Sequence, residues 1–189
     1  MDRIITEQIP ADQLSEHVEK RLHLILERDL KIRHGGVLRD AAKLVLHRRY
    51  ARHEIINHFG VQYDPASHAT GVIEFPGRTV IITKLDTTGA KREFQYENAF
   101  LSDRIMQWQS QNRQRRDNRP GRRLLDYRQL AIELHLFVQR RATSEAVYLG
   151  CVDIRSVRGD GPMTLELSLR DPLSSGVAGD LGIAIDRVR

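Results

Sequence analysis

The residues with the clearest chemical character in this sequence are arginines that cluster near its middle. Six arginines and a single aspartate lie within residues 113–123. A guanidinium group is planar and donates paired hydrogen bonds that match phosphate oxygens, so the cluster favours contact with a phosphate backbone. Pro120 and Gly121 predict a loop rather than a helix, and a loop can follow such a backbone. The alternative is a solvated basic loop that binds no partner.

Amide and aromatic side chains precede the arginines and add groups that could read bases. Glutamine amides can hydrogen-bond base edges, and an aromatic ring can stack on a base. The predicted DNA-contacting residues are Gln109, Gln111, Arg113, Arg115, Arg116, Arg119, Arg122 and Arg123. The predicted lining of a pocket for an altered base or phosphate is Tyr96, Ser102, Trp108 and Ser110. Two alternatives stay open: a core position for the single tryptophan, and a structural turn formed by residues 108–111.

Motifs for metal binding and catalysis are incomplete. Residues 53–58 resemble a zinc-protease helix, but Asn57 stands where the second histidine is required, and His58 lies about 100° further round the helix. Asp29-Leu30-Lys31 has a nuclease-like spacing only inside a predicted helix. The single cysteine, Cys151, lies in an apolar stretch and is expected in the core. The sequence therefore predicts no catalytic residue, no metal site and no cofactor, and an unrecognised nuclease stays as an alternative.

Composition indicates a compact cytoplasmic protein. With 189 residues, 40% of them hydrophobic, the chain can bury a core. It lacks an apolar run of about 20 residues that could cross a bilayer, and its first residues are too acidic for a signal peptide, so no membrane partner is expected. The formal net charge is +5, and 25 of the 30 basic residues are arginine. This bias suits a polyanionic partner, although arginine-favouring codon usage would produce it as well.

The elements that must position these residues fall into two regions. Residues 1–60 are predicted to form helices: one after Pro10, a second through Leu46 and a third over residues 52–59. From residue 70 the apolar period changes to two, which predicts strands at 71–75, 78–85, 93–96, 132–139, 147–154 and 163–170. We expect an α+β protein in which an N-terminal helical segment, residues 1–60, packs on a β-rich domain, residues 61–189. That domain is predicted to be a mostly antiparallel, partly open β-barrel of about six strands, with a flexible tail from residue 174.

Several short motifs run along the chain in a recognisable order. The most specific is Trp108-Gln109-Ser110-Gln111, and others occur at residues 50–56, 148–150 and 161–163. Together they resemble the uncharacterised domain that lies C-terminal in many bacterial DEAD/DEAH-type helicases, often with a phospholipase-D-like nuclease module. The resemblance covers about residues 45–173. The chain departs from that pattern at Gln107, where the family usually has a histidine or similar residue, and it is expected to be a free-standing copy without the helicase and nuclease parts.

The resemblance implies work on DNA in restriction, phage defence or repair, and it supplies no catalytic residue. The leading hypothesis is a non-catalytic module that binds duplex DNA through the arginine cluster. A more specific form is a reader of modified DNA that acts as the targeting unit of a nuclease or helicase. The alternative from another class is an adaptor subunit of a defence complex that binds another protein through the apolar stripe of residues 14–30.

Overall fold

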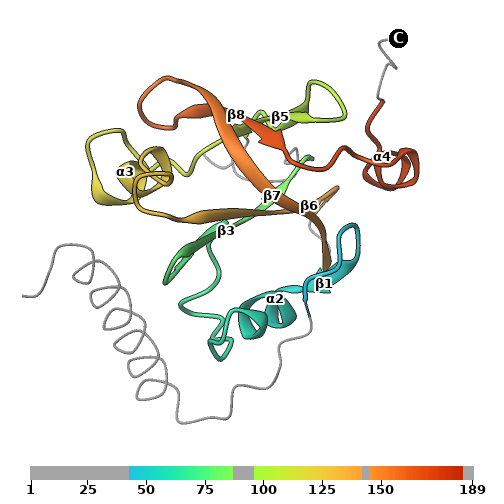
Figure 1. The fold of residues 1–189 in the computed structure, drawn as a ribbon, viewed down its shortest axis with the longest axis horizontal. Coiled ribbons are helices and arrows are strands. Elements are labelled where there is room, and N and C mark those ends of the chain that lie inside the picture. Colours follow the sequence, from blue (N-terminus) through green and yellow to red (C-terminus); the bar gives the residue numbers. More distant parts are fainter. Residues whose placement is uncertain (1–42, 87–95, 142–144, 185–189) are drawn as a thin grey trace, which may run out of the picture. The chain divides into compact units, whose positions relative to one another are not determined.

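The computed structural model describes residues 43–86, 96–141 and 145–184. These residues form one mixed sheet of eight strands and three helices (Figure 1). The strands are β1 (Arg49–Ala51), β2 (Val72–Phe75), β3 (Arg78–Lys84), β4 (Ala99–Phe100), β5 (Ile105–Gln109), β6 (Glu133–Gln139), β7 (Glu145–Arg158) and β8 (Thr164–Leu169). The helices are α2 (Arg52–His58), α3 (Arg119–Leu125) and α4 (Ser175–Leu181). Each of these helices has seven residues, far fewer than the roughly 20 that a membrane span needs.

The strands follow the order β2-β3-β6-β7-β8-β5-β4, and β1 pairs with β7 beside this path. All pairings are antiparallel except β3 with β6, which is parallel in the register Arg78↔Glu133 to Lys84↔Gln139. The described strands do not close into the predicted barrel, because the two end strands, β2 and β4, are not paired. The α+β class fits, and the sheet is mostly antiparallel as predicted, but it has eight strands rather than about six and forms no barrel among the described residues. The parallel pair arises from a long connection that contains β4, β5 and α3, and local periodicity does not encode such a crossover.

The period-two pattern identified most of the sheet correctly. The β2–β3 hairpin turns at Pro76 and Gly77, where the backbone φ of Gly77 is +67°. Along β8, Leu165, Leu167 and Leu169 are buried, and the residues between them are partly exposed. Strands β6 and β7 cover the predicted ranges as well. Burial alternates along β8, which is covered on one face, whereas β3 and β6 are buried on both faces.

Other expectations need correction. The described part of the predicted second helix, residues 43–46, is not helical, and a turn at residues 46–47 leads to β1. Of the predicted strand at 93–96, only Tyr96 lies within the described residues, and it is not in a strand. The tail contains α4, because Ser174 accepts a hydrogen bond from the Val177 amide and caps this helix. The predicted helices and apolar stripe before residue 43 lie outside the described residues.

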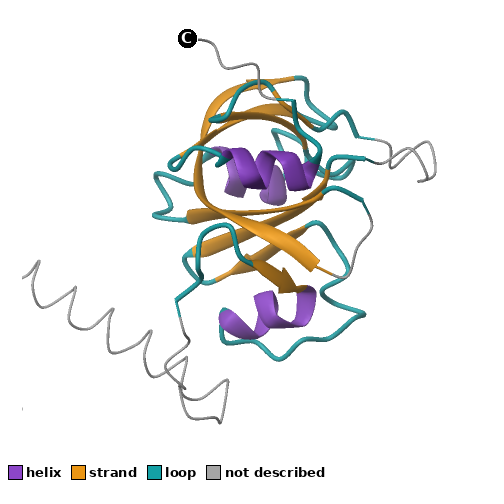
Figure 2. Cartoon of the chain, turned by 90° about the vertical axis from the view of Figure 1, so that its right-hand side faces the viewer, coloured by secondary structure: helices purple, strands orange, loops and turns teal. Residues whose placement is uncertain are grey.

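Two apolar clusters occupy opposite faces of the sheet. One contains Trp108, Leu134 and Leu136 and is covered by α3 and α4. The other contains Phe137 and is covered by Ile55 and Ile56 of α2, which are fully buried. Figure 2 shows α2 apart from the other two helices, around which the strands curve in the upper part of the view. Residues 49–58, which the prediction placed in the helical segment, thus pack with the sheet.

A buried asparagine holds the curved sheet together where strand pairing is absent. The Asn98 Nδ2 donates to Thr83 Oγ1 and to the Lys84 carbonyl, both at 3.0 Å. Its Oδ1 accepts from the backbone N–H of Gln109 at 2.9 Å. Asn98 therefore joins the end of β3 to the end of β5, two strands that are not neighbours in the sheet. This contact places the segment after β5 close to the β2–β3 side of the domain.

Candidate nucleic-acid interface

The arginine-rich segment starts from a buried anchor. Trp108 is 3% exposed and belongs to the core, in agreement with the alternative stated for it above. Ser110 is fully buried and forms two hydrogen bonds with Met163, at 2.8 Å from its backbone N–H and at 2.9 Å to its Oγ. The Gln111 amide then donates to Gln114 Oε1 at 3.0 Å. The chain therefore leaves β5 along a fixed path.

Asn118 organises the next part of the segment and starts α3. Its Oδ1 accepts from the backbone N–H groups of Arg115, at 3.2 Å, and Gly121, at 3.0 Å. Its Nδ2 donates to the Arg113 carbonyl at 2.7 Å. The predicted loop at Pro120 is thus wrong: proline in the first helical turn costs no hydrogen bond, because the amides there have no partner within the helix.

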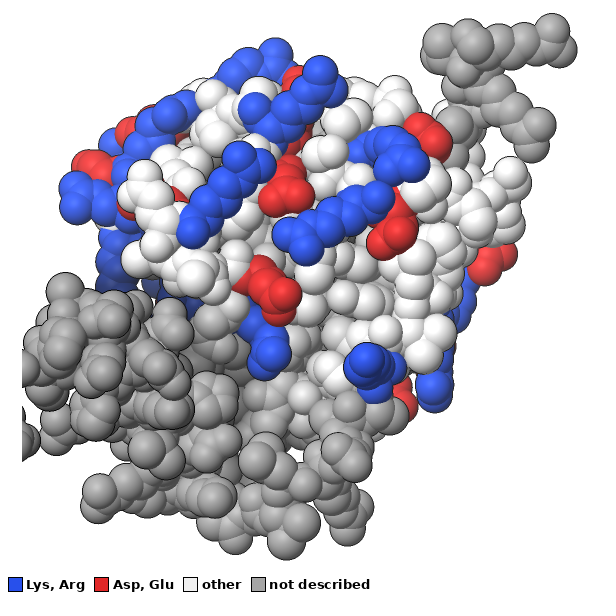
Figure 3. Space-filling model, in the orientation of Figure 1, with Lys and Arg blue, Asp and Glu red and all other residues white. Residues whose placement is uncertain are grey.

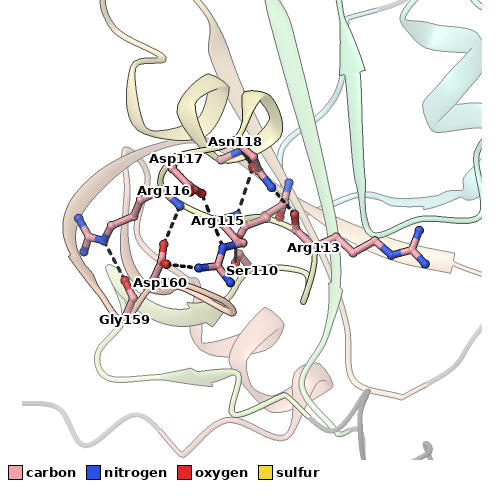
Figure 4. A network of polar contacts seen from close by, with 10 residues as sticks. Ser110, Arg113, Arg115, Arg116, Asp117, Asn118, Gly159 and Asp160 are labelled. Carbon is pink, nitrogen blue, oxygen red and sulfur yellow. Dashed lines mark hydrogen bonds and ion pairs between the residues drawn. The ribbon is translucent and has the colours of Figure 1, made fainter.

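Two of the six arginines attach the segment to the turn between β7 and β8 (Figure 4). The Arg115 Nη2 donates to Asp160 Oδ2 at 2.8 Å. The Arg116 backbone N–H donates to Asp160 Oδ1 at 2.9 Å, and its guanidinium donates to the carbonyls of Gly159 and Val157. These guanidinium groups are occupied by the protein itself, so their first role is structural.

Arg123 attaches α3 to the β2–β3 hairpin. Its Nη2 donates to the carbonyls of Phe75, at 2.7 Å, and Arg78, at 3.1 Å. Its Nε lies 3.5 Å from Glu74 Oε2, and the side chain is 20% exposed. Arg123 is therefore attached to the rest of the domain, as are Arg115 and Arg116.

The other three arginines present their charges to solvent. Arg113 and Arg122 are exposed and form no side-chain hydrogen bond or ion pair with the described residues. The Arg119 side chain is 88% exposed, and its one ion pair, with Glu74, is long at 3.7 Å. Arg119, Arg122, Arg123 and the 54% exposed Leu130 line a shallow pocket on α3. Figure 3 shows basic side chains gathered on the upper part of the described face, with acidic ones between them.

The residues predicted to line a base pocket do not converge in the structure. Trp108 and Ser110 are buried, and Ser102 Oγ accepts from two backbone amides in the β4–β5 turn. Tyr96 is partly exposed, and burial raises the pKa of its hydroxyl. Gln109 Oε1 accepts from the Glu97 amide at 2.9 Å and so serves the local backbone.

One buried titratable cluster escaped the sequence prediction. The His135 Nδ1 lies 2.9 Å from Tyr148 Oη and 3.8 Å from Cys151 Sγ, and its Nε2 lies 3.6 Å from Glu133 Oε2. Burial lowers the pKa of His135 and raises the pKa of the Cys151 thiol. A protonated thiol is a poor nucleophile, so the arrangement does not activate Cys151. Within the described ranges, no three acidic, histidine or cysteine side chains are placed to hold a metal ion.

Comparisons with known proteins identify the family of the chain and a distantly similar structure. A family model described as "Domain of unknown function (DUF3427)" matches residues 44–180. No curated protein matches the chain. Among solved structures, the chain is similar to the DNA modification-dependent restriction endonuclease AspBHI, with a TM-score of 0.43 and 12% identity over 77% of this chain and 86% of that chain. No residue role is transferred from a likeness of this degree.

Proposed function

This chain belongs to the family described as domain of unknown function (DUF3427), and we propose that it is a non-catalytic module that binds duplex DNA through Arg113, Arg119 and Arg122. The predicted membership in an uncharacterised domain family is confirmed. The helicase-associated context stays a prediction, and so does the adaptor role.

The observation that carries this proposal is that three of the six arginines are bound by the protein itself, while the other three are exposed. Arg115 and Arg116, together with the Nη2 group of Arg123, donate hydrogen bonds to Asp160 and to backbone carbonyls. They hold the backbone that carries the other three. A ligand that binds to side chains on a fixed backbone pays less conformational entropy than one that must first order a loop.

The charge of the exposed arginines is available to a polyanion. An exposed ion pair such as that of Arg119 with Glu74 contributes about 1 kcal/mol or less, so a phosphate can replace it. Arg119 and Arg122 are three residues apart on α3 and therefore lie on the same face of the helix. Arginine–phosphate contacts form with DNA of any sequence, and the affinity of binding through them decreases as the salt concentration rises.

A salt titration of a labelled duplex, followed by fluorescence anisotropy, tests the proposal. We expect the triple variant Arg113→Gln, Arg119→Gln, Arg122→Gln to reduce the slope of log affinity against log salt by about three units. The matched control, Arg48→Gln, Arg49→Gln, Arg141→Gln, removes the same charge elsewhere and should leave the slope nearly unchanged. Equal losses in both triple variants, or wild-type binding weaker than about 100 µM at low salt, would refute the proposal.

Two further arms address the more specific hypotheses. Recognition of modified DNA stays a prediction, and comparing plain, methylated, hydroxymethylated and phosphorothioated duplexes of one sequence tests it. A preference for one of them would support a reader, and equal affinity would leave a general backbone binder. Cleavage of plasmid DNA in the presence of Mg²⁺ would contradict the non-catalytic role.

A further inference from the structure

A carboxylate from a different part of the sheet lies against the arginines of α3. Glu74, on the end strand β2, places one oxygen, Oε2, 3.5 Å from Arg123 Nε and 3.7 Å from Arg119 Nη2. Its side chain is 32% exposed. A single carboxylate oxygen thus occupies the position between two guanidinium groups at the edge of the arginine pocket.

The Glu74 carboxylate does not satisfy all the hydrogen-bond donors of the two guanidinium groups beside it. The Arg123 Nε is buried and has no hydrogen-bond partner among the described residues, since the Glu74 oxygen is too far away to accept well. Arg123 cannot move closer, because its Nη2 is held by the carbonyls of Phe75 and Arg78. A buried guanidinium donor without an acceptor is unfavourable. The pocket therefore has a fixed donor that points at an anion and lacks a good acceptor.

We propose that this position binds one phosphate of the DNA backbone, and that Glu74 is an intramolecular competitor that occupies it in the free protein. The inference rests on the proposed function and adds a residue that limits its affinity. A phosphate carries several acceptor oxygens, so it can take hydrogen bonds from Arg119, Arg122 and Arg123 together. Glu74 contacts only two of these three arginines.

The surroundings favour a phosphate that belongs to a nucleotide chain. Leu130 lines the same pocket and is 54% exposed, so an apolar surface lies next to the cationic one. A sugar attached to the phosphate can cover this leucine, which a free phosphate ion does not. Arg119 is almost fully exposed and can turn from Glu74 to the incoming phosphate without disturbing the core.

The test compares three variants of the full chain by anisotropy with the same labelled duplex. Glu74→Gln removes the competing charge and is expected to bind about two- to fivefold tighter, with the salt slope unchanged because the same phosphates are contacted. Glu74→Asp keeps the net charge but withdraws the carboxylate from the arginines, so it should also bind tighter. The control Asp180→Asn removes one carboxylate from the exposed ion pair with Arg49 near α4, on the other side of the domain from α3, and measures the effect of net charge alone (Figure 1).

The outcomes separate this inference from the proposed function. If wild-type protein fails to bind DNA, the proposed function fails. If it binds and the arginine triple variant loses binding, but the Glu74 variants bind no more tightly than Asp180→Asn, the competitor role alone is refuted. A second measurement asks whether the pocket instead binds a free phosphate ion. Thermal unfolding temperatures are compared in inorganic phosphate and in chloride at equal ionic strength. Strong stabilisation of Glu74→Gln by phosphate without any gain in DNA affinity would assign the pocket to the free ion and overturn the inference.

Discussion

Replacing Gly121 by alanine sets two effects of known size against each other. In the first turn of α3, alanine should stabilise the helix by at most about 1 kcal/mol relative to glycine. A Cβ at this position, however, would lie 2.6 Å from the Arg115 carbonyl carbon and closer still to the carbonyl oxygen. Backbone at this distance cannot yield as a flexible side chain does, so residues 115 and 116 must move away from the helix.

The movement breaks hydrogen bonds that can be counted. Those at risk join the Asn118 amide to the Arg115 carbonyl, the Arg115 amide to Asn118 Oδ1, and the Arg116 amide to Asp160 Oδ1. At about 1 kcal/mol each, with about 1–3 kcal/mol of residual strain, their loss exceeds the gain in helix propensity. We expect Gly121→Ala to lower the free energy of unfolding by about 3–5 kcal/mol and the melting temperature by about 6–20 °C.

Urea denaturation and thermal unfolding measure this change directly. The matched control is Gly179→Ala in α4, where a Cβ would meet nothing within 4 Å, and it should be neutral or stabilising by up to about 1 kcal/mol. Because the displaced backbone carries Arg113 and leads into α3, Gly121→Ala should also weaken DNA binding at temperatures where it remains folded. A Gly121→Ala protein as stable as Gly179→Ala would refute the close contact of α3 with residue 115.

Three other perturbations test separate parts of the structure. Trp108→Ala should lower the free energy of unfolding by about 3–5 kcal/mol in urea, with the salt slope of DNA binding unchanged; weaker binding with normal melting would contradict its core position. Arg116→Gln and Arg123→Gln should each lower stability by about 1–2 kcal/mol, whereas Arg122→Gln should stay within about 0.5 kcal/mol, and equal effects would contradict the division of the arginines. Burial lowers the pKa of His135, opposed by Glu133 and assisted by Arg78 and His58, so the unfolded chain binds this proton at higher pH than the folded protein. Stability should therefore be full above about pH 6.5 and decrease below it, and His135→Gln should flatten this decrease; an identical pH dependence in both proteins would refute the assignment.

The sequence predicted those elements that a local pattern of apolar residues marks, and it missed those without such a pattern. Strand β8 was identified because alternate side chains enter the core, and β6 because its leucines and valine recur at every second position, although both of its faces are buried. Strand β5 was not predicted, since Gln107 and Gln109 are partly exposed and only Met106 and Trp108 indicate the buried face. Helix α3 was missed because Pro120 and Gly121 were treated as breakers, although the first turn of a helix tolerates both.

The arginine cluster was identified by residue type alone, but the sequence could not tell which of its members are free. The partners that occupy Arg116 and Arg123 are mostly backbone carbonyls, which leave no trace in residue type. The other partners, Asp160 and Glu74, lie more than 40 residues from the arginines that they contact, one on each side of the segment. Only the folded sheet brings these groups together, so the distinction between structural and exposed arginines depends on tertiary contacts.

The pairing of β1 with β7 affects how the chain is made. Arg49 is paired with Val147, and the fully buried Ile55 and Ile56 pack in a cluster with Phe137 and Tyr148. On a ribosome that adds roughly 5–20 residues per second, these early residues wait about 5–20 s for their partners to emerge. Until Phe137 and Tyr148 have been added, the cluster around the two isoleucines cannot be completed. The nascent chain therefore exposes apolar surface that the folded protein buries.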